Sequence, residues 1–210
     1  MKIPKKPNKK ELNIFEKKFF LNKKKYHNEN DFYSPVTLDL YYLYHIIILN
    51  KRLNILEFGT GFSTLIFSHA LKLNKLFYKN INFNKIGIDI PFNLFAIDDQ
   101  KKYIKISKNR FDNYDVSKYV KPKFLFSKCK LKLINNQICN EYSILPNFIP
   151  DFIYIDGPDT NMITNSINGL NISKNKNFMP MSSDVLKIEN YLSPGTIIAI
   201  DGRYHNAIFL

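Results

Sequence analysis

Four acidic residues stand at the ends of apolar, strand-like segments, and they are the first candidates for chemistry. These residues are Glu57, Asp98, Asp156 and Asp201. A single acid at a strand end commonly caps a turn, but four acids that share one edge of a sheet are typical of a binding site. Carboxylates there accept hydrogen bonds from ligand hydroxyls, act as general bases or ligate a divalent cation.

A glycine turn follows the first of these acids. Gly59 and Gly61 flank Thr60, and Ser63 begins a helix-like segment behind them. Glycine lets the backbone approach a ligand closely, and a helix that starts there directs N–H groups toward it. Such a turn suits a nucleotide-like or carboxylate-bearing cofactor. The dinucleotide pattern G-x-G-x-x-G needs glycine where Thr64 stands, which disfavours a nicotinamide-dependent Rossmann oxidoreductase.

The acids and the turn require a scaffold of alternating strands and helices. The predicted strands are 53–58, 94–97, 123–126, 151–155 and 196–200. Strands that are apolar on both faces and alternate with helices indicate an α/β fold with a parallel sheet covered on each side. Ligands of such sheets bind at the carboxyl ends of the strands.

Helices and irregular segments are expected between these strands. The predicted helices are one opened by Ser34 and Pro35 that runs to Leu49, one from Ser63, one around 102–106, and one from Ser183 to Leu192 with Asp184 in its first turn. Residues 131–142 predict a hairpin that turns at Asn135 and Asn136. Residues 73–92 are expected to be an irregular insertion, and 160–178 a loop that is either mobile or a lid over a substrate.

The composition describes one globular domain with a basic N-terminal arm. The chain has 210 residues, 45% of them hydrophobic, which is enough to bury a core. Of its net charge of +13, residues 1–25 carry +8 through ten Lys and two Glu. We expect a solvated helical arm over 1–33 and the folded domain over 34–210. An RNA-binding protein or RNA methyltransferase would use such an arm as an electrostatic hold, so RNA stays open as a partner.

No segment indicates secretion or a membrane. Charged residues interrupt the apolar positions of the N-terminus, so a signal-peptide core is missing. The longest strongly apolar run, 41–49, is far shorter than the about 20 residues that span a bilayer. Cys129 and Cys139 lack metal-type spacing and are expected to be free thiols in a reducing compartment. We therefore expect a cytoplasmic protein without a membrane partner.

The ordered set of motifs resembles the class I S-adenosylmethionine-dependent methyltransferases over about residues 53–201. Residues 55–64 resemble their first motif, 96–98 their second-strand acid, and 152–157 and 195–201 their fourth and fifth strands. The Ile-Asp-Gly after the fourth strand is most similar to small-molecule and sugar O-methyltransferases. The resemblance implies a Rossmann-like, doubly wound, mostly parallel sheet of order 3-2-1-4-5, S-adenosylmethionine as cofactor, and a small molecule or sugar as methyl acceptor.

The resemblance also implies a role for each cofactor-binding residue. Glu57 would lie beside the amino group of the cofactor, and the Gly59–Gly61 backbone would direct N–H donors at its carboxylate. Asp98 would accept both ribose hydroxyls. Asn140 and Glu141 stand where the family often contacts adenine. The full set of implied cofactor residues is Glu57, Gly59, Thr60, Gly61, Ser63, Asp98, Glu141 and Asp156.

The implied chemistry centres on Asp156 and Asp201. Either carboxylate would take the proton of a hydroxyl acceptor, or the two would ligate a divalent cation, with Mg²⁺ favoured by oxygen ligands. In metal-dependent members Asn follows the fifth-strand acid, whereas Gly202 stands here. His205 would lie near the same site, as catalytic group or surface histidine, and Arg203 would pair with an anionic substrate.

Two departures from the family pattern matter. Residues 156–159 match the D-P-P-Y signature of nucleic-acid amino methyltransferases in two positions of four, and the missing aromatic disfavours base methylation. The family continues beyond the fifth strand through a helix and two further strands, whereas this sequence stops within ten residues of it. We therefore expect C-terminal strands to be missing. The methyl acceptor and the oligomeric state stay open.

Overall fold

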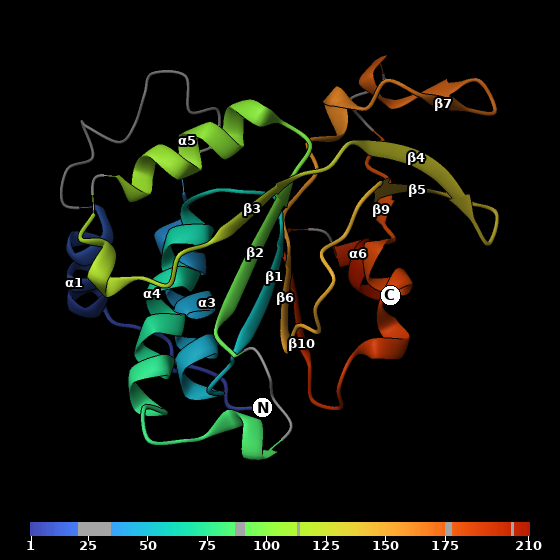
Figure 1. Ribbon diagram of the computed structural model, residues 1–210. Helices are drawn as coiled ribbons and strands as arrows, with labels where there is room; N and C mark the ends of the chain where they lie inside the picture. The colour runs from blue at the N-terminus through green and yellow to red at the C-terminus, as the bar shows by residue number, and fades with distance from the viewer. Residues whose placement is uncertain (21–34, 87–90, 113, 175–177, 203) are drawn as a thin grey trace.

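A parallel sheet lies at the centre of the molecule (Figure 1). The computed structural model describes residues 1–20, 35–86, 91–112, 114–174, 178–202 and 204–210. Within these residues the sheet has five strands, which are, from edge to edge, β3 (Lys123–Phe126), β2 (Asn93–Asp98), β1 (Asn54–Phe58), β6 (Phe152–Ile155) and β10 (Ile197–Ile200). The predicted Rossmann-like α/β fold with strand order 3-2-1-4-5 is confirmed.

The register of the sheet brings the predicted acids to one edge. Glu57 of β1 pairs with Ala96 of β2 and with Tyr154 of β6. All neighbouring strands of this sheet are parallel, so their carboxyl ends meet at the same edge. The strands β1 and β6 are buried on both faces, as expected of a parallel sheet between two layers.

Three helices cover one face of the sheet (Figure 1). They are α1 (Lys9–Phe20), α3 (Thr37–Leu49) and α4 (Phe62–Phe77). Phe15 and Phe19, one turn apart on α1, are buried against Tyr44 of α3. The basic arm is therefore not simply a solvated helix, because its aromatic side belongs to the core. Lys9, Lys10 and Lys17 are exposed, whereas Lys18 donates to the hydroxyl of Tyr44 at 3.1 Å. The predicted cap Ser34 lies outside the described residues, and α3 begins at Thr37 rather than at Pro35.

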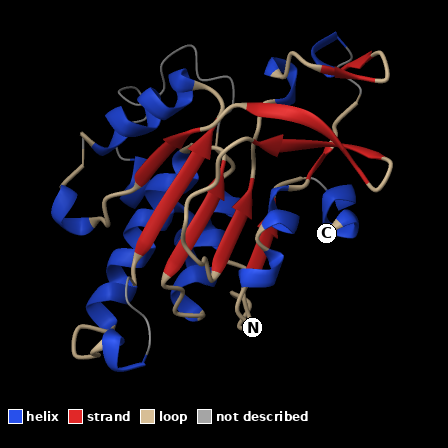
Figure 2. Cartoon of the chain, turned by 45° about the vertical axis from the view of Figure 1, so that its right-hand side comes forward, coloured by secondary structure: helices blue, strands red, loops and turns tan. Residues whose placement is uncertain are grey.

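Short elements cover the opposite face (Figure 2). The hairpin of β4 (Cys129–Ile134) and β5 (Gln137–Tyr142) is the one predicted, and Asn135 and Asn136 form its turn with φ values of 49° and 62°. The other elements of this face are β7 (Ser166–Ile167), β8 (Leu170–Asn171), β9 (Met181–Ser182), α6 (Tyr204–Phe209) and the 3-10 helices η3 (Thr160–Met162), η4 (Ile172–Lys174), η5 (Asp184–Lys187) and η6 (Glu189–Tyr191).

The prediction of an α-helix from Ser183 to Leu192 is wrong. The chain forms η5 and η6 there instead, and Ser183 makes no side-chain cap. Its hydroxyl donates to the carbonyl of Asn140 at 3.1 Å, and the Asp184 carboxylate accepts the N–H of Tyr142 at 2.9 Å. Both side chains thus bind the hairpin, and this pairing replaces the first turn of the predicted helix.

Two segments predicted as irregular contain regular structure. Residues 73–77 are the last turn and a half of α4, and the remainder of that insertion includes the 3-10 helix η1 (Phe83–Ile86). Within 160–178, β7 and β8 pair around Asn168 and Gly169, whose φ values are 51° and 80°. Asn-Gly is a strong two-residue hairpin signal, so the sequence contained the information for this turn.

The helix α5 (Lys101–Phe111) crosses the carboxyl edge of the sheet, at the top of Figure 1. It follows the end of β2 and leads through η2 (Val116–Lys118) to β3. Its position above the strand ends makes it one wall of the space that the acids share. No described helix is long and apolar enough to cross a membrane.

Candidate active-site cleft

A cleft of about 560 Å³ opens at the carboxyl edge of the sheet. Its walls are the start of α3, the glycine turn after β1, one face of α5, the loop after β6, and the residues after β10. Sites for small molecules and cofactors have volumes of this order. The cleft therefore lies where the fold class places ligands.

The glycine turn and Asp98 are joined directly inside this cleft. The hydroxyl of Thr60 donates to Asp98 Oδ2 at 2.9 Å, and the N–H of Gln100 donates to Asp98 Oδ1 at 2.7 Å. Burial raises the pKa of Asp98 to about 6, although the hydrogen bonds from Gln100 and Thr60 oppose that shift. At neutral pH the carboxyl is mostly ionised, and besides the hydrogen bonds from Gln100 and from the hydroxyl and backbone of Thr60 the carboxylate keeps acceptor capacity for a ligand donor.

Glu57 supports the glycine turn from inside the protein. Its side chain is fully buried and does not line the cleft. It accepts hydrogen bonds from the hydroxyls of Ser63 and Thr64, the latter at 2.7 Å, and Thr64 Oγ1 accepts the N–H of Gly61 at 3.2 Å. Burial raises the pKa of Glu57 to about 8. The implied contact of Glu57 with a ligand amino group does not follow from this geometry, whereas Ser63 does line the cleft.

A second glycine turn packs directly on the first. The N–H groups of Asp156 and Gly157 both donate to the carbonyl of Phe58, at 2.9 and 2.7 Å. A Cβ atom placed on Gly157 would lie 2.8 Å from the Gly59 backbone, and Gly59 itself has a φ of 101°. Side chains therefore fit at neither position, and the turn after β6 is held at the end of β1 with Asp156 in the wall of the cleft.

The carboxylates gather at the end of the cleft formed by β6, β10 and α3. Asp156 and Asp201 are exposed and line it, as the sequence predicted. Asp39, in the first turn of α3, lines the same end, and burial together with the charge of Asp201 raises its pKa. Asp39 has no functional signal in the sequence, because an acid in the first turn of a helix is an ordinary feature of helix termini.

The wall formed by α5 was also missed. Tyr103, Ile106, Ser107 and Arg110 line the cleft at the spacing of one helical face. Arg110 is 8% exposed, and its guanidinium carbon lies 3.9 Å from the centroid of the Phe62 ring. The helix was predicted around 102–106, but its extension to Phe111 and its course over the strand ends have no sequence signal.

The remaining predicted residues lie elsewhere. Glu141, on β5, is buried and ion-paired with Lys132 and with Lys187, whose Nζ is 3.1 Å away, and it does not line the cleft. His205 lies exposed on α6, beside a separate groove with Met181. Arg203 lies outside the described residues. Among the described residues, no three His, Cys, Asp or Glu side chains are grouped to hold a metal ion.

Comparison with protein-family models and with curated proteins finds no match for this chain. A Rossmann-like fold hosts many unrelated functions. The residues of the cleft are therefore the guide to function.

Proposed function

We propose that the protein is an S-adenosylmethionine-dependent methyltransferase that acts on a hydroxyl of a small molecule or sugar. The observation that carries the proposal is the Thr60–Asp98 hydrogen bond, which joins the two-glycine turn and the second-strand acid in one cleft. One nucleoside cofactor can contact both the turn and the acid only if they lie no farther apart than the cofactor is long. The resemblance assigns them to the amino-acid end and to the ribose.

In this proposal the chain binds and orients rather than reacts covalently. Asp98 accepts the ribose hydroxyls, for which an ionised carboxylate is a strong acceptor. The cofactor supplies a methyl group on a sulfonium, which needs an aligned nucleophile more than an elaborate catalyst. Asp156 or Asp201 would accept the proton of the acceptor hydroxyl and pass it to solvent. The acceptor oxygen would take the methyl group as its bond to the sulfonium sulfur breaks, which leaves a neutral thioether.

Isothermal titration with S-adenosylmethionine and with its product S-adenosylhomocysteine tests the proposal. We expect both nucleosides to bind the wild type, and Asp98→Ala to weaken binding about tenfold or more, because a charge-assisted pair of hydrogen bonds is lost. Asp115→Ala is the matched control, since Asp115 is an exposed acid outside the cleft. If the folded wild type binds neither nucleoside, the proposal is wrong.

Two further arms separate the alternatives. Stabilisation by NAD but not by S-adenosylhomocysteine in a thermal-shift experiment would favour an oxidoreductase. Mg²⁺ often binds through only one or two carboxylates and water, so Asp156 and Asp201 could be sufficient to hold it. Methyl transfer is therefore also measured in the presence of a chelator. Loss of activity with the chelator, restored by Mg²⁺, would assign Asp156 and Asp201 as ligands rather than as bases.

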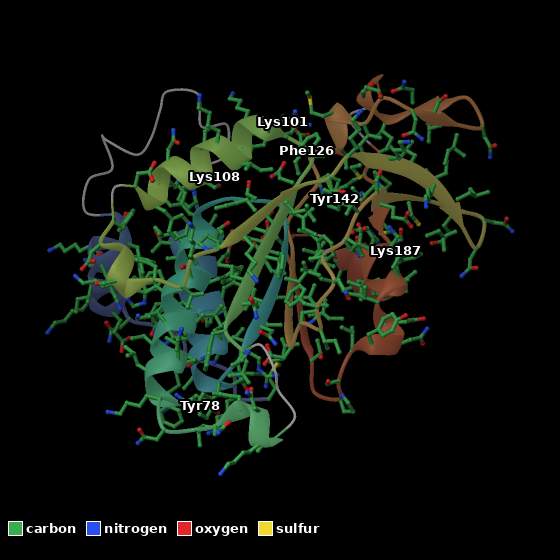
Figure 3. The ribbon with its side chains drawn as sticks, in the orientation of Figure 1. Tyr78, Lys101, Lys108, Phe126, Tyr142 and Lys187 are labelled. Atoms are coloured by element: carbon green, nitrogen blue, oxygen red, sulfur yellow. The ribbon has the colours of Figure 1, made fainter. Side chains whose placement is uncertain are left out.

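RNA binding is a second candidate, supported by the exposed side of α5. Lys101 and Lys108 lie along this helix, and their ammonium groups stand 5.0 and 5.8 Å from the ring centroids of Phe126 and Phe124 on β3 (Figure 3). Phe126 is exposed and Phe124 is half-buried. Lysines beside accessible aromatic rings suit single-stranded nucleic acid. Affinity for a single-stranded RNA should then fall steeply with salt, and Lys101→Gln with Lys108→Gln should flatten that dependence. An unchanged salt dependence would reject this surface.

The basic arm requires a gentler test than deletion. Phe15 and Phe19 are part of the core, so removing α1 would also remove packing. Neutralising the exposed Lys9, Lys10 and Lys17 by glutamine tests the arm instead. RNA binding is assigned to the arm if these three changes flatten the salt dependence of RNA affinity and the changes at Lys101 and Lys108 do not.

A further inference from the structure

The N–H groups of the glycine turn are engaged within the protein. The N–H of Gly59 donates to the carbonyl of Ile97 at 2.7 Å, and that of Gly61 donates to Thr64 Oγ1 at 3.2 Å. The backbone of Thr60 hydrogen-bonds to the Asp98 carboxylate. These three groups were expected to receive the carboxylate of the cofactor. A carboxylate at this end of the cleft therefore needs other donors.

The facing wall of the cleft supplies a cation. Arg110 is the only basic side chain that lines the cleft among the residues the structure describes, whereas five aspartates line it. Its guanidinium lies over the Phe62 ring, directly after the glycine turn. This contact fixes the position of the guanidinium beside the turn, and a guanidinium carries several N–H donors in a planar fork that matches a carboxylate.

Ser107 adds a hydroxyl on the same helical face. It lies three residues before Arg110 and lines the same cleft. The side chain is 1% exposed, and its Oγ has no hydrogen-bond partner in the described part of the chain. A buried hydroxyl without a partner costs free energy, which a ligand oxygen at that place would offset.

We propose that Arg110 and Ser107 form a carboxylate subsite that receives the amino-acid end of the cofactor, in place of the glycine turn. The inference rests on the proposed function. The charges of the cleft agree with this assignment. Arg110 matches the single carboxylate of the cofactor, and the aspartates match its ammonium and sulfonium groups. The subsite fixes the amino-acid end against α5, while Asp98 holds the ribose.

Two nucleosides that differ in the amino-acid end test the subsite. S-adenosylhomocysteine has the carboxylate, and 5′-methylthioadenosine lacks the whole amino-acid group. In calorimetric titrations we expect Arg110→Met to weaken S-adenosylhomocysteine about 10- to 100-fold and to leave methylthioadenosine within about twofold. Ser107→Ala should have a smaller effect with the same selectivity, and Arg110→Lys should restore part of the loss.

Lys105→Met is the matched control, because Lys105 is an exposed residue of the same helix that does not line the cleft. It removes one positive charge near the cleft and should change neither affinity. Retained binding of methylthioadenosine by Arg110→Met also shows that the variant is folded. The inference is overturned if Arg110→Met weakens both nucleosides equally, or neither. Failure of both nucleosides to bind the wild type would instead overturn the proposed function.

Discussion

On one face of the central sheet three α-helices bury an aromatic core, whereas on the other a hairpin, short strands and 3-10 helices bury a mainly aliphatic one. Helices satisfy most of their own backbone, so on the first face polar side chains serve mainly the helix ends, as the buried Asn74 does for the carbonyls of Ile47 and Arg52. The second face must find partners for many loop N–H and C=O groups. Its polar side chains supply many of these hydrogen-bond partners.

Two asparagines illustrate the second face. Asn206 of α6 accepts the N–H of Ser182 at 2.6 Å and donates to its carbonyl at 3.3 Å. Asn165 does the same for Leu131, at 2.8 and 3.0 Å. Each amide takes the place of a neighbouring strand. The difference between the faces teaches that irregular cover is stabilised by specific side-chain amides, and regular cover by apolar periodicity.

The largest effect is expected on the helical face. Phe19→Ala should lower the free energy of unfolding by about 3 to 5 kcal/mol, because a fully buried ring is lost from the core. Urea unfolding measures it. Ile14→Ala, on the exposed side of α1, is the control and should stay within about 0.5 kcal/mol of the wild type. Equal effects would show that α1 does not pack on the domain.

A smaller loss is expected when an asparagine is removed from the irregular face. Asn206→Ala should cost about 1 to 3 kcal/mol, because the buried N–H and carbonyl of Ser182 lose their partner. The exposed Tyr204→Ala, on the same helix, should cost little. A value for Asn206→Ala near zero, measured by urea unfolding, would contradict the role given to these amides.

The buried acids of both faces predict how stability depends on pH. Burial raises the pKa of Glu57 from 4.5 to about 8, so the folded state holds this proton more tightly than the unfolded chain does. Stability present below pH 4.5 is therefore lost as the pH rises toward about 8. Glu57→Gln should reduce the slope by at most about 1.4 kcal/mol per pH unit.

Asp184 is a buried acid of the irregular face, and burial raises its pKa to about 7. Its contribution to the pH dependence of stability should remain in Glu57→Gln. Urea unfolding at several pH values between 5 and 8 makes the comparison. Parallel curves for the wild type and Glu57→Gln would show that Glu57 does not bind a proton on folding.

The smallest effect is local. Asn165→Ala should lower the free energy of unfolding by about 0.5 to 1.5 kcal/mol, since Asn165 is only half-buried. The amide of Leu131 should lose protection from hydrogen exchange by a larger factor than the amides of β1. Uniform loss across both faces would indicate that the two covers unfold as one unit.

The sequence predicted the sheet, α3 and α4, because apolar runs and helix-start signals determine them, but it treated α1 as a solvated arm and missed the burial of Phe15 and Phe19. Of the four strand-end acids that the sequence singled out, three line the cleft, namely Asp98, Asp156 and Asp201. The predicted helix cap at Ser183 is wrong, because the hydroxyl of Ser183 donates to the carbonyl of Asn140 on β5 instead. Asp39 and Arg110 were also missed, since no local signal tells where α3 and α5 meet the strand ends.

The contact between Gly59 and Gly157 has a consequence for altering what the cleft accepts. Bare main chain from two turns meets there, so rotamer changes cannot widen or narrow that part of the cavity. Tyr103 and Ile106, on the opposite wall, are ordinary side chains of a helix and can be exchanged for smaller or larger ones. Efforts to change ligand preference should therefore begin on α5 and leave the paired turns untouched.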